Sequence, residues 1–394
     1  MFDFSQFPFW SLAIIPLAIV FLWLLFRTKQ SHKRQQSTLS SEYFKGLNYL
    51  LNDEQGKALD VFVKLVESNW DTIDTHFTLG KIYRKNGEMD KAIKIHQGLI
   101  GRPSLPEQYR CKILLELGYD YLGAGWFDRA EGLFKEVLIQ DEKSTEARHN
   151  LILIYQQEKN WFKAIEIAVD LYSENPDETG PMIAHYYCEL AEISKLKGDV
   201  SQLENYSKKA LHYDDACVRA SIIMADQIKA TGDDKKAIAL YETIESQDVE
   251  SIILVIDSLS ECYENLSSQD KLYDYLLALQ HRHKNLFLQN HIAGVLEKSQ
   301  GSRAAIVYLT DEIKRQPTLS GMQKLISYKQ EEIDSDRVFS DLAVVMSVLQ
   351  KDKVEYRCQK CGFNTNTHYW LCPSCNRWDS VKPGILQPEH LHII

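Results

Sequence analysis

The sequence predicts an all-α fold class, namely a solenoid of paired helices with one transmembrane helix before it and one small tetracysteine knuckle after it. Three observations support this prediction. A pattern of small and aromatic residues repeats along the chain, residues 7–26 carry no formal charge, and four cysteines cluster near the C-terminus. We therefore expect five segments, with boundaries at 1–27, 28–41, 42–350, 354–383 and 384–394.

The helical repeat is clearest where Leu-Gly-x-x-Tyr occurs at residues 79–83 and again at 117–121. The step from Gly46 to Gly80 is 34 residues, which is the period of a tetratricopeptide helix pair. Small residues at the eighth and twentieth positions of a copy let its two helices approach closely. Eight copies stay in phase, and the copy around Ser260 and Leu272 is the poorest. An ordinary helical bundle has no reason to keep this phase, so we interpret 42–350 as a tetratricopeptide array.

Two segments that contain prolines, 101–106 and 175–181, interrupt the period. We expect both to lengthen turns on one edge of the array, where they either shape a partner site or form neutral loops. After Asp334 the repeat signature fades, but residues 339–349 keep a helical period and predict a capping helix.

The N-terminal apolar run, FPFWSLAIIPLAIVFLWLLF, is long enough to cross a bilayer as a helix. Trp10 and Trp23 lie near its ends, where indole rings favour the membrane interface. A cleaved signal peptide fits less well, because no basic residue precedes the run and no small-residue cleavage site follows it. Basic residues, among them Arg27 and Lys29, follow the span, so the positive-inside rule places the N-terminus in the periplasm and the rest in the cytoplasm. Residues 28–41 are expected to form a juxtamembrane linker.

Composition excludes some functions. The net charge of −10 and pI near 5.7 argue against a nucleic-acid partner. Four scattered cysteines lie within helical patterns, so we interpret them as small core residues in a reducing compartment and not as disulfide partners. These are Cys111, Cys188, Cys217 and Cys262.

The strongest chemical signal is a pair of Cys-x-x-Cys motifs with ten residues between them, the spacing of a tetrathiolate metal site. The predicted ligands are Cys358, Cys361, Cys372 and Cys375. Gly362 and Asn376 follow the second cysteine of each motif, where such a turn needs a positive φ. Tetrahedral sulfur ligation suits zinc or a single iron, and spacing alone does not decide between them.

The two motifs, Cys-x-x-Cys-Gly-Phe and Cys-Pro-x-Cys, resemble the two knuckles of rubredoxin, which holds one iron. Rubredoxin has a longer segment between its knuckles, so a structural clamp is favoured over a free electron carrier. Tyr369, Trp370 and Trp378 are expected to shield the site and to bury it against the final helices, or simply to form the core of this small module.

No catalytic motif is present: the sequence has no phosphate-binding loop, nucleophile elbow or zinc-protease helix. His281 and His283 flank Arg282 on a repeat helix and are too few to indicate a site. His390 and His392 lie in a tail that we interpret as polar and without a second metal site. We therefore expect a protein that is not an enzyme.

An apolar span, a tetratricopeptide array and the run YRCQKCGFNTNTHYWLCPSCNRWDSVKP, in that order, resemble the lipopolysaccharide assembly protein B family of Gram-negative bacteria. The resemblance implies a non-enzymatic inner-membrane regulator of lipopolysaccharide biosynthesis. Its implied partners are a membrane-anchored ATP-dependent metalloprotease, the deacetylase that commits UDP-acyl-N-acetylglucosamine to lipid A, and an opposing inner-membrane protein that senses lipopolysaccharide. It also implies one metal ion on the four cysteines, with iron favoured over zinc.

Two other functions stay open on the sequence. The chain could be a scaffold for enzymes of lipopolysaccharide synthesis or export that works without a protease, or a rubredoxin-like redox protein. The sequence also leaves open whether the chain forms a homo-oligomer, and which repeat residues bind a client.

Overall fold

The computed structural model describes residues 41–52, 54–68, 73–103, 105–283, 288–332 and 355–383. The predicted span, almost all of the linker, the capping helix at 339–349 and the tail lie outside these ranges, and so do the interface residues Trp10, Trp23, Arg27 and Lys29. Within the described ranges, none of the helices combines the length and the apolar character that a bilayer crossing requires.

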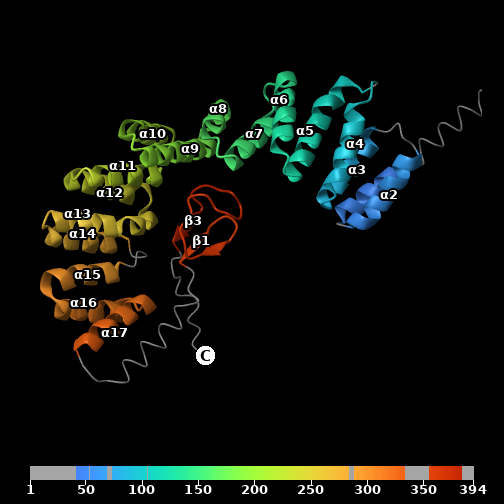
Figure 1. Ribbon diagram of the computed structural model, residues 1–394. Helices are drawn as coiled ribbons and strands as arrows, with labels where there is room; N and C mark the ends of the chain where they lie inside the picture. Colours follow the sequence, from blue (N-terminus) through green and yellow to red (C-terminus); the bar gives the residue numbers. More distant parts are fainter. Residues whose placement is uncertain are drawn as a thin grey trace, which may run out of the picture. The chain divides into compact units, whose positions relative to one another are not determined.

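The chain divides into two compact units, Met1–Glu158 and Lys159–Ile394. In the first unit, a helix over residues 41–51 precedes six labelled helices. Figure 1 shows α2 to α6 stacked in chain order, from blue to green. The bounds of the six labelled helices are α2 Gln55–Ser68, α3 Ile73–Lys85, α4 Met89–Ile100, α5 Glu107–Gly123, α6 Phe127–Gln140 and α7 Thr145–Gln157.

The small residues of the repeat do what the pattern predicts. Gly118 on α5 faces the ring of Phe134 on α6, and a Cβ at Gly118 would lie only 2.6 Å from the Phe134 Cε1 atom. The twentieth residue of each copy is fully buried: Ala58, Ala92, Ala130, Ala164, Leu203, Ala237, Leu272 and Ala305. The helices of a pair therefore pack closely because a small or buried residue stands at each of these two positions. Even the poorest copy keeps the arrangement, with leucine in place of alanine.

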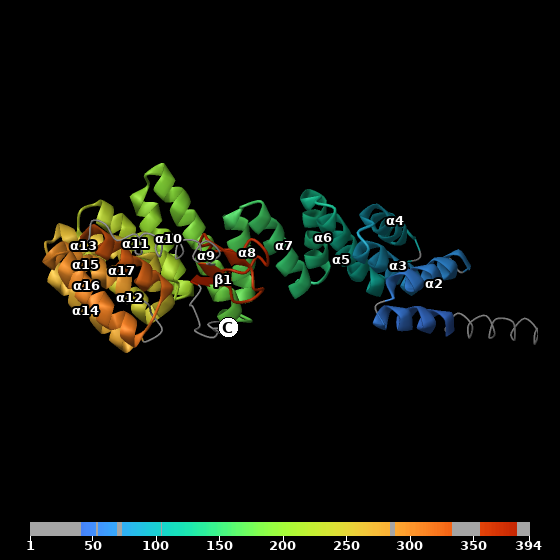
Figure 2. The same cartoon turned by 90° about the horizontal axis from the view of Figure 1, so that it is seen from below.

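In the second unit, helices α8 to α17 continue the repeat, and a small metal module follows them (Figures 1 and 2). The helices are α8 Trp161–Tyr172, α9 Pro176–Lys197, α10 Val200–Tyr213, α11 Val218–Ala230, α12 Asp234–Gln247, α13 Ile256–Asn265, α14 Gln269–Arg282, α15 Gln289–Gln300, α16 Ser302–Arg315 and α17 Leu319–Glu332. A short 3-10 helix, η1, covers Val249–Leu254 between α12 and α13.

The segment 175–181 is not the lengthened turn that the prolines predicted. It forms the first turns of α9, which runs for 22 residues. Pro176 is the first residue of this helix, a position where the missing N–H costs nothing because no helical partner exists for it. Asp177 and Glu178 add negative charge at the positive end of the helix dipole. Pro181 lies inside the helix, where it has no N–H to donate to the carbonyl four residues earlier, and the helix continues past it. Residues 101–106, by contrast, do separate α4 from α5 as predicted.

Three short antiparallel strands form the sheet of the metal module, in the order β2-β1-β3. Their bounds are β1 Tyr356–Cys358, β2 Asn364–Thr365 and β3 Val381–Pro383. Tyr356 in the central strand pairs with Thr365 on one side and with Pro383 on the other. The described part of the chain is thus mostly helical, with strands in this module. Both views place the module beside α9 (Figures 1 and 2).

Candidate metal centre

The two cysteine motifs fold into turns with the same hydrogen bonds. In the first, the N–H of Cys358 donates to the carbonyl of Phe363, and the N–H of Gly362 donates back to the carbonyl of Cys358. In the second, Cys372 and Asn376 repeat both bonds at the same spacing, with Arg377 as the first acceptor. The predicted positive φ angles are present, at +76° for Gly362 and +52° for Asn376. Each turn therefore aims two sulfur atoms in one direction.

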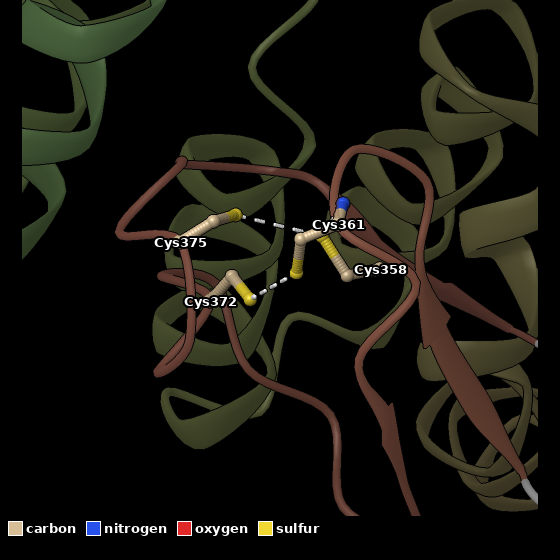
Figure 3. Close-up of side chains that lie close together, drawn as sticks. All are labelled: Cys358, Cys361, Cys372 and Cys375. Atoms are coloured by element: carbon tan, nitrogen blue, oxygen red, sulfur yellow. Dashed lines mark hydrogen bonds between the residues drawn. The ribbon is translucent and has the colours of Figure 1, made fainter. Parts of the chain in front are cut away.

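The four sulfur atoms meet between the two turns, all within 4.8 Å of one another. Figure 3 shows the side chains pointing toward a common centre, and the closest pairs are Cys358–Cys375 at 3.7 Å and Cys361–Cys372 at 3.8 Å. A disulfide would need about 2.05 Å, so these are separate thiols. Four sulfurs about 2.3 Å from one ion form a tetrahedron with edges of about 3.8 Å. The arrangement therefore fits a tetrahedral metal ion.

The surroundings of the sulfurs favour the metal-binding thiolate at Cys358 and disfavour it at Cys375. The sulfur of Cys358 lies 3.4 Å from the hydroxyl of Ser380 and 3.5 Å from the backbone N of Cys361. Burial alone would raise the pKa of Cys358, but these hydrogen bonds lower it to about 6. Burial and the neighbouring thiols raise the pKa of Cys375 to about 11. A bound divalent cation would favour the thiolate on all four residues, because its charge reverses this repulsion.

Trp378, three residues after the last cysteine, packs the module onto the array. Its ring stacks on His185 of α9 with centroids 4.9 Å apart and planes 10° from parallel. Trp161 of α8 and Tyr186 of α9 meet the same indole edge to face, at 6.3 Å and 5.9 Å. His185 is only 2% exposed. Because burial, with the nearby charges of Arg219 and Lys382, lowers the pKa of His185 to about 3, this stacked imidazole is neutral.

A second contact comes from the strand that closes the sheet. Lys382 of β3 places its Nζ 2.8 Å from Asp248 Oδ2, at the N-cap of η1, and 2.8 Å from Asp379 Oδ1 within the module. The lysine side chain is 12% exposed. Burial lowers the pKa of Lys382, and the two carboxylates more than offset it and raise the pKa. Trp370 adds an aromatic contact, with the guanidinium of Arg219 6.0 Å from its ring centroid.

These contacts correct one prediction and add residues that the sequence did not reveal. The ring contacts of Trp370 and Trp378 with the array lie on helices α8, α9 and α11, whereas one of the two roles expected of these residues was burial against the final helices. Trp370 also packs against a hydrophobic cluster that extends from α11 to α17. Tyr369 is 41% exposed and shields little. His185 and Asp248 belong to no sequence motif, and their partners lie far along the chain, so no local pattern indicates them.

The predicted burial of the four scattered cysteines is confirmed for Cys188, Cys217 and Cys262, while Cys111 is partly exposed.

Comparison with known proteins identifies both the metal module and the helical repeat. Residues 356–383 match a family described as rubredoxin metal binding domain, and residues 75–106 match the tetratricopeptide repeat. The four cysteines thus form a rubredoxin-like metal-binding site, whose geometry accepts zinc or iron. A tetratricopeptide repeat protein from Parabacteroides merdae is 17% identical with a TM-score of 0.32, covering 53% of this chain and 78% of its own, a likeness too loose to say anything about a site.

Two curated relatives match almost end to end. Lipopolysaccharide assembly protein B of Escherichia coli K12 is 33% identical over 375 residues, which cover 94% of this chain and 96% of that protein. The protein of the same name from Haemophilus influenzae is 28% identical over 392 residues, covering 96% of this chain and 98% of its own. Because this similarity spans nearly the whole length of both partners, the chain belongs to the lipopolysaccharide assembly protein B family.

Proposed function

We propose that this protein is a non-enzymatic adaptor at the cytoplasmic face of the bacterial inner membrane that regulates lipopolysaccharide biosynthesis. In this proposal it presents the deacetylase that commits precursors to lipid A to a membrane-anchored ATP-dependent metalloprotease. An inner-membrane protein that senses lipopolysaccharide opposes it. The observation that carries the proposal is the near full-length similarity to proteins named for lipopolysaccharide assembly.

The helical array supports an adaptor over an enzyme. Tetratricopeptide repeats build extended surfaces that bind other proteins, and each repeat needs only its neighbours for stability. One buried polar cluster of the array has a clear structural role. The carboxylate of Asp120 is fully buried between Arg84 and His96, at 2.7 Å and 2.5 Å, and so ties α5 to α3 and α4. Binding of a client, and not chemistry on it, is the role that this architecture fits.

Membrane attachment is part of the same proposal. Residues 1–27 serve as the anchor, with Trp10, Trp23, Arg27 and Lys29 at the interfaces, and residues 28–41 as the linker. Residues 42–350 form the array and 354–383 the metal module, both in the cytoplasm. Anchoring confines the client near a protease in the same membrane, which raises their effective concentration without any new contact.

The test is the half-life of the deacetylase in cells. Cells that lack this chain should degrade the deacetylase several times more slowly than cells with the full chain, and a version that starts at Thr28 should behave like the deletion. A version whose span is replaced by an unrelated transmembrane helix is the matched control and should restore degradation. Unchanged deacetylase turnover in the deletion would remove the protease from the proposal and favour the scaffold instead.

The identity of the metal ion distinguishes the proposed adaptor from the remaining alternative, a rubredoxin-like redox protein. We propose that Cys358, Cys361, Cys372 and Cys375 hold one ion, with iron favoured by the resemblance to rubredoxin. Metal analysis of the protein purified from its own cells identifies the ion. If a zinc-loaded protein supports full deacetylase turnover, a redox role is excluded, because zinc does not change its oxidation state.

A further inference from the structure

Several contacts join the metal module to the helical array, and two of them hold segments that flank the metal-ligating cysteines. We call them the stacking contact, between Trp378 and His185, and the charge contact, between Lys382 and Asp248. Neither array residue is near a metal-ligating cysteine in the sequence. The side chain of His185 is buried, and those of Lys382 and Asp248 are 12% and 24% exposed, so both contacts are largely shielded from water.

The stacking contact fixes both ends of the second turn. Trp378 pairs with Leu371 through an isolated bridge, and Leu371 directly precedes Cys372. The N–H of Asp379 also donates to the carbonyl of Trp370, at 2.7 Å. A Trp378 ring held on His185 therefore fixes the place where the chain enters Cys372 and leaves Cys375.

The charge contact fixes the strand behind the first turn. Lys382 follows Val381, which pairs with Cys358 in the sheet and is fully buried against Cys358 and Cys372. Ser380, on the other side of Val381, contacts the sulfur of Cys358. Asp248 holds this strand from outside, so the position of one sulfur depends on an array residue.

We infer that His185 and Asp248 are positioning residues for the metal ion, and that metal binding and the stability of helices α9 to α12 are coupled. Groups that hold metal ligands in place typically change metal affinity by about 10–100-fold when removed. Coupling is reciprocal: if the array strengthens metal binding, the metal strengthens the array by the same factor. The metal ion would thus control the rigidity of the helices that meet the module.

This inference rests on the four cysteines as ligands and not on which client the adaptor binds. The experiment uses the full chain in detergent, loaded with Zn²⁺ alone, and measures transfer of zinc to a coloured chelator. Cys372→Ser tests the assignment of the four ligands separately, because full zinc loading of this variant would contradict that assignment. The positioning role is tested on variants that keep all four cysteines and load zinc normally.

Removal of either contact should speed zinc release. We expect His185→Ala and Lys382→Met to release zinc at least about 10-fold faster than the wild type, as for other groups that orient ligands. Arg377→Met is the matched control, since Arg377 in the module pairs with Glu178 at 3.8 Å while both side chains are more than 60% exposed. Such an exposed pair contributes little, so release should stay within about twofold.

Three further measurements separate positioning from general damage. Arg282→Met breaks an ion pair with Glu245 that joins α14 to α12 at 2.8 Å without touching either contact, so its zinc release should match that of the wild type. His185→Phe keeps a flat ring for Trp378 and should restore slow release. In the wild type, zinc removal should also increase amide hydrogen exchange in α9 and η1, and it should do so less in Lys382→Met. Wild-type release rates in both His185→Ala and Lys382→Met, or unchanged exchange on zinc removal, would overturn the inference.

Discussion

At the scale of single residues, the sequence identified those whose role is local. Gly362 and Asn376 follow a cysteine in a motif of known geometry, so their positive φ angles could be predicted from the sequence. His185 could not be predicted in this way. Its neighbours in the sequence are those of any buried residue on a repeat helix. Its role depends on the ring of Trp378, which is distant in the sequence. Local patterns encode turns, whereas contacts distant in sequence are encoded only by shape complementarity.

Asn376 provides a first prediction. Replacement by valine places a β-branched residue at a φ of +52°, a conformation that should cost about 1–2 kcal/mol. The zinc-loaded module should then unfold at a lower denaturant concentration, measured by tryptophan fluorescence. Asn376→Gly is the control, because glycine adopts this φ freely, and it should be at least as stable as the wild type. Equal stability of the valine variant would contradict the assigned backbone geometry.

His185 provides a second prediction, on pH. Its pKa in the folded protein is about 3, well below its usual 6.5, so as pH falls below 6.5 the unfolded chain takes up a proton that the folded chain refuses. Stability should therefore fall with decreasing pH, by up to about 1.4 kcal/mol per pH unit from this residue. His185→Phe removes this contribution, so its stability should depend less on pH between 7 and 5. His368 has its pKa lowered to about 4 and is present in both proteins, so its effect cancels.

At the scale of elements, the repeat period predicted the paired helices correctly, whereas the prolines of segment 175–181 led to one wrong prediction of a turn. The 34-residue step predicted which residues are small and buried, because two helices of a pair cannot approach otherwise. Segment 175–181 was expected to be a turn, but Pro176 begins a helix, where it is favoured. Neither Pro176 at the first helical position nor Pro181 inside α9 ends the helix. The sequence alone did not separate a turn from a helix here.

The close approach of α5 and α6 gives a third prediction. Gly118→Ala places a methyl group 2.6 Å from the Phe134 ring and should destabilise the first unit by about 1–3 kcal/mol. Gly132→Ala on α6 is the matched control, because no atom lies within 4 Å of its added methyl. Alanine in an open helical position should stabilise by up to about 1 kcal/mol. Opposite shifts in thermal unfolding would support the packing, and equal shifts would contradict it.

At the scale of the whole molecule, the sequence predicted a helical array followed by a metal module, but it did not predict where the module docks. Composition and spacing identified the array and the tetracysteine site, and both are present in the described residues. The helices that receive the module carry no signal in the sequence, because a tetratricopeptide array offers many similar faces. The placement of Trp378 on His185 and of Lys382 on Asp248 helps to select one of these faces.

The metal gives a fourth prediction. A module of three short strands has too small a core to fold by itself, so its ion supplies much of its stability. Cys358→Ser should leave the residues beyond Gln350 open to protease while helices α2 to α7 of the first unit stay resistant, as followed by mass spectrometry of the fragments. Cys111→Ser is the control, since this partly exposed thiol lies outside the site, and its fragments should match the wild type. Full resistance of the module in Cys358→Ser would show that the metal is dispensable for folding.

The distance along the chain between the two sides of the charge contact also matters while the protein is being made. Lys382 follows Asp248 by 134 residues. At 5–20 residues per second, a ribosome needs roughly 7 to 27 seconds to make that stretch. During this interval the nascent helices present their unfilled aromatic face to the crowded cell. The docking of the module is therefore the last step in the folding of the chain, and it comes long after the helices that receive it have been made.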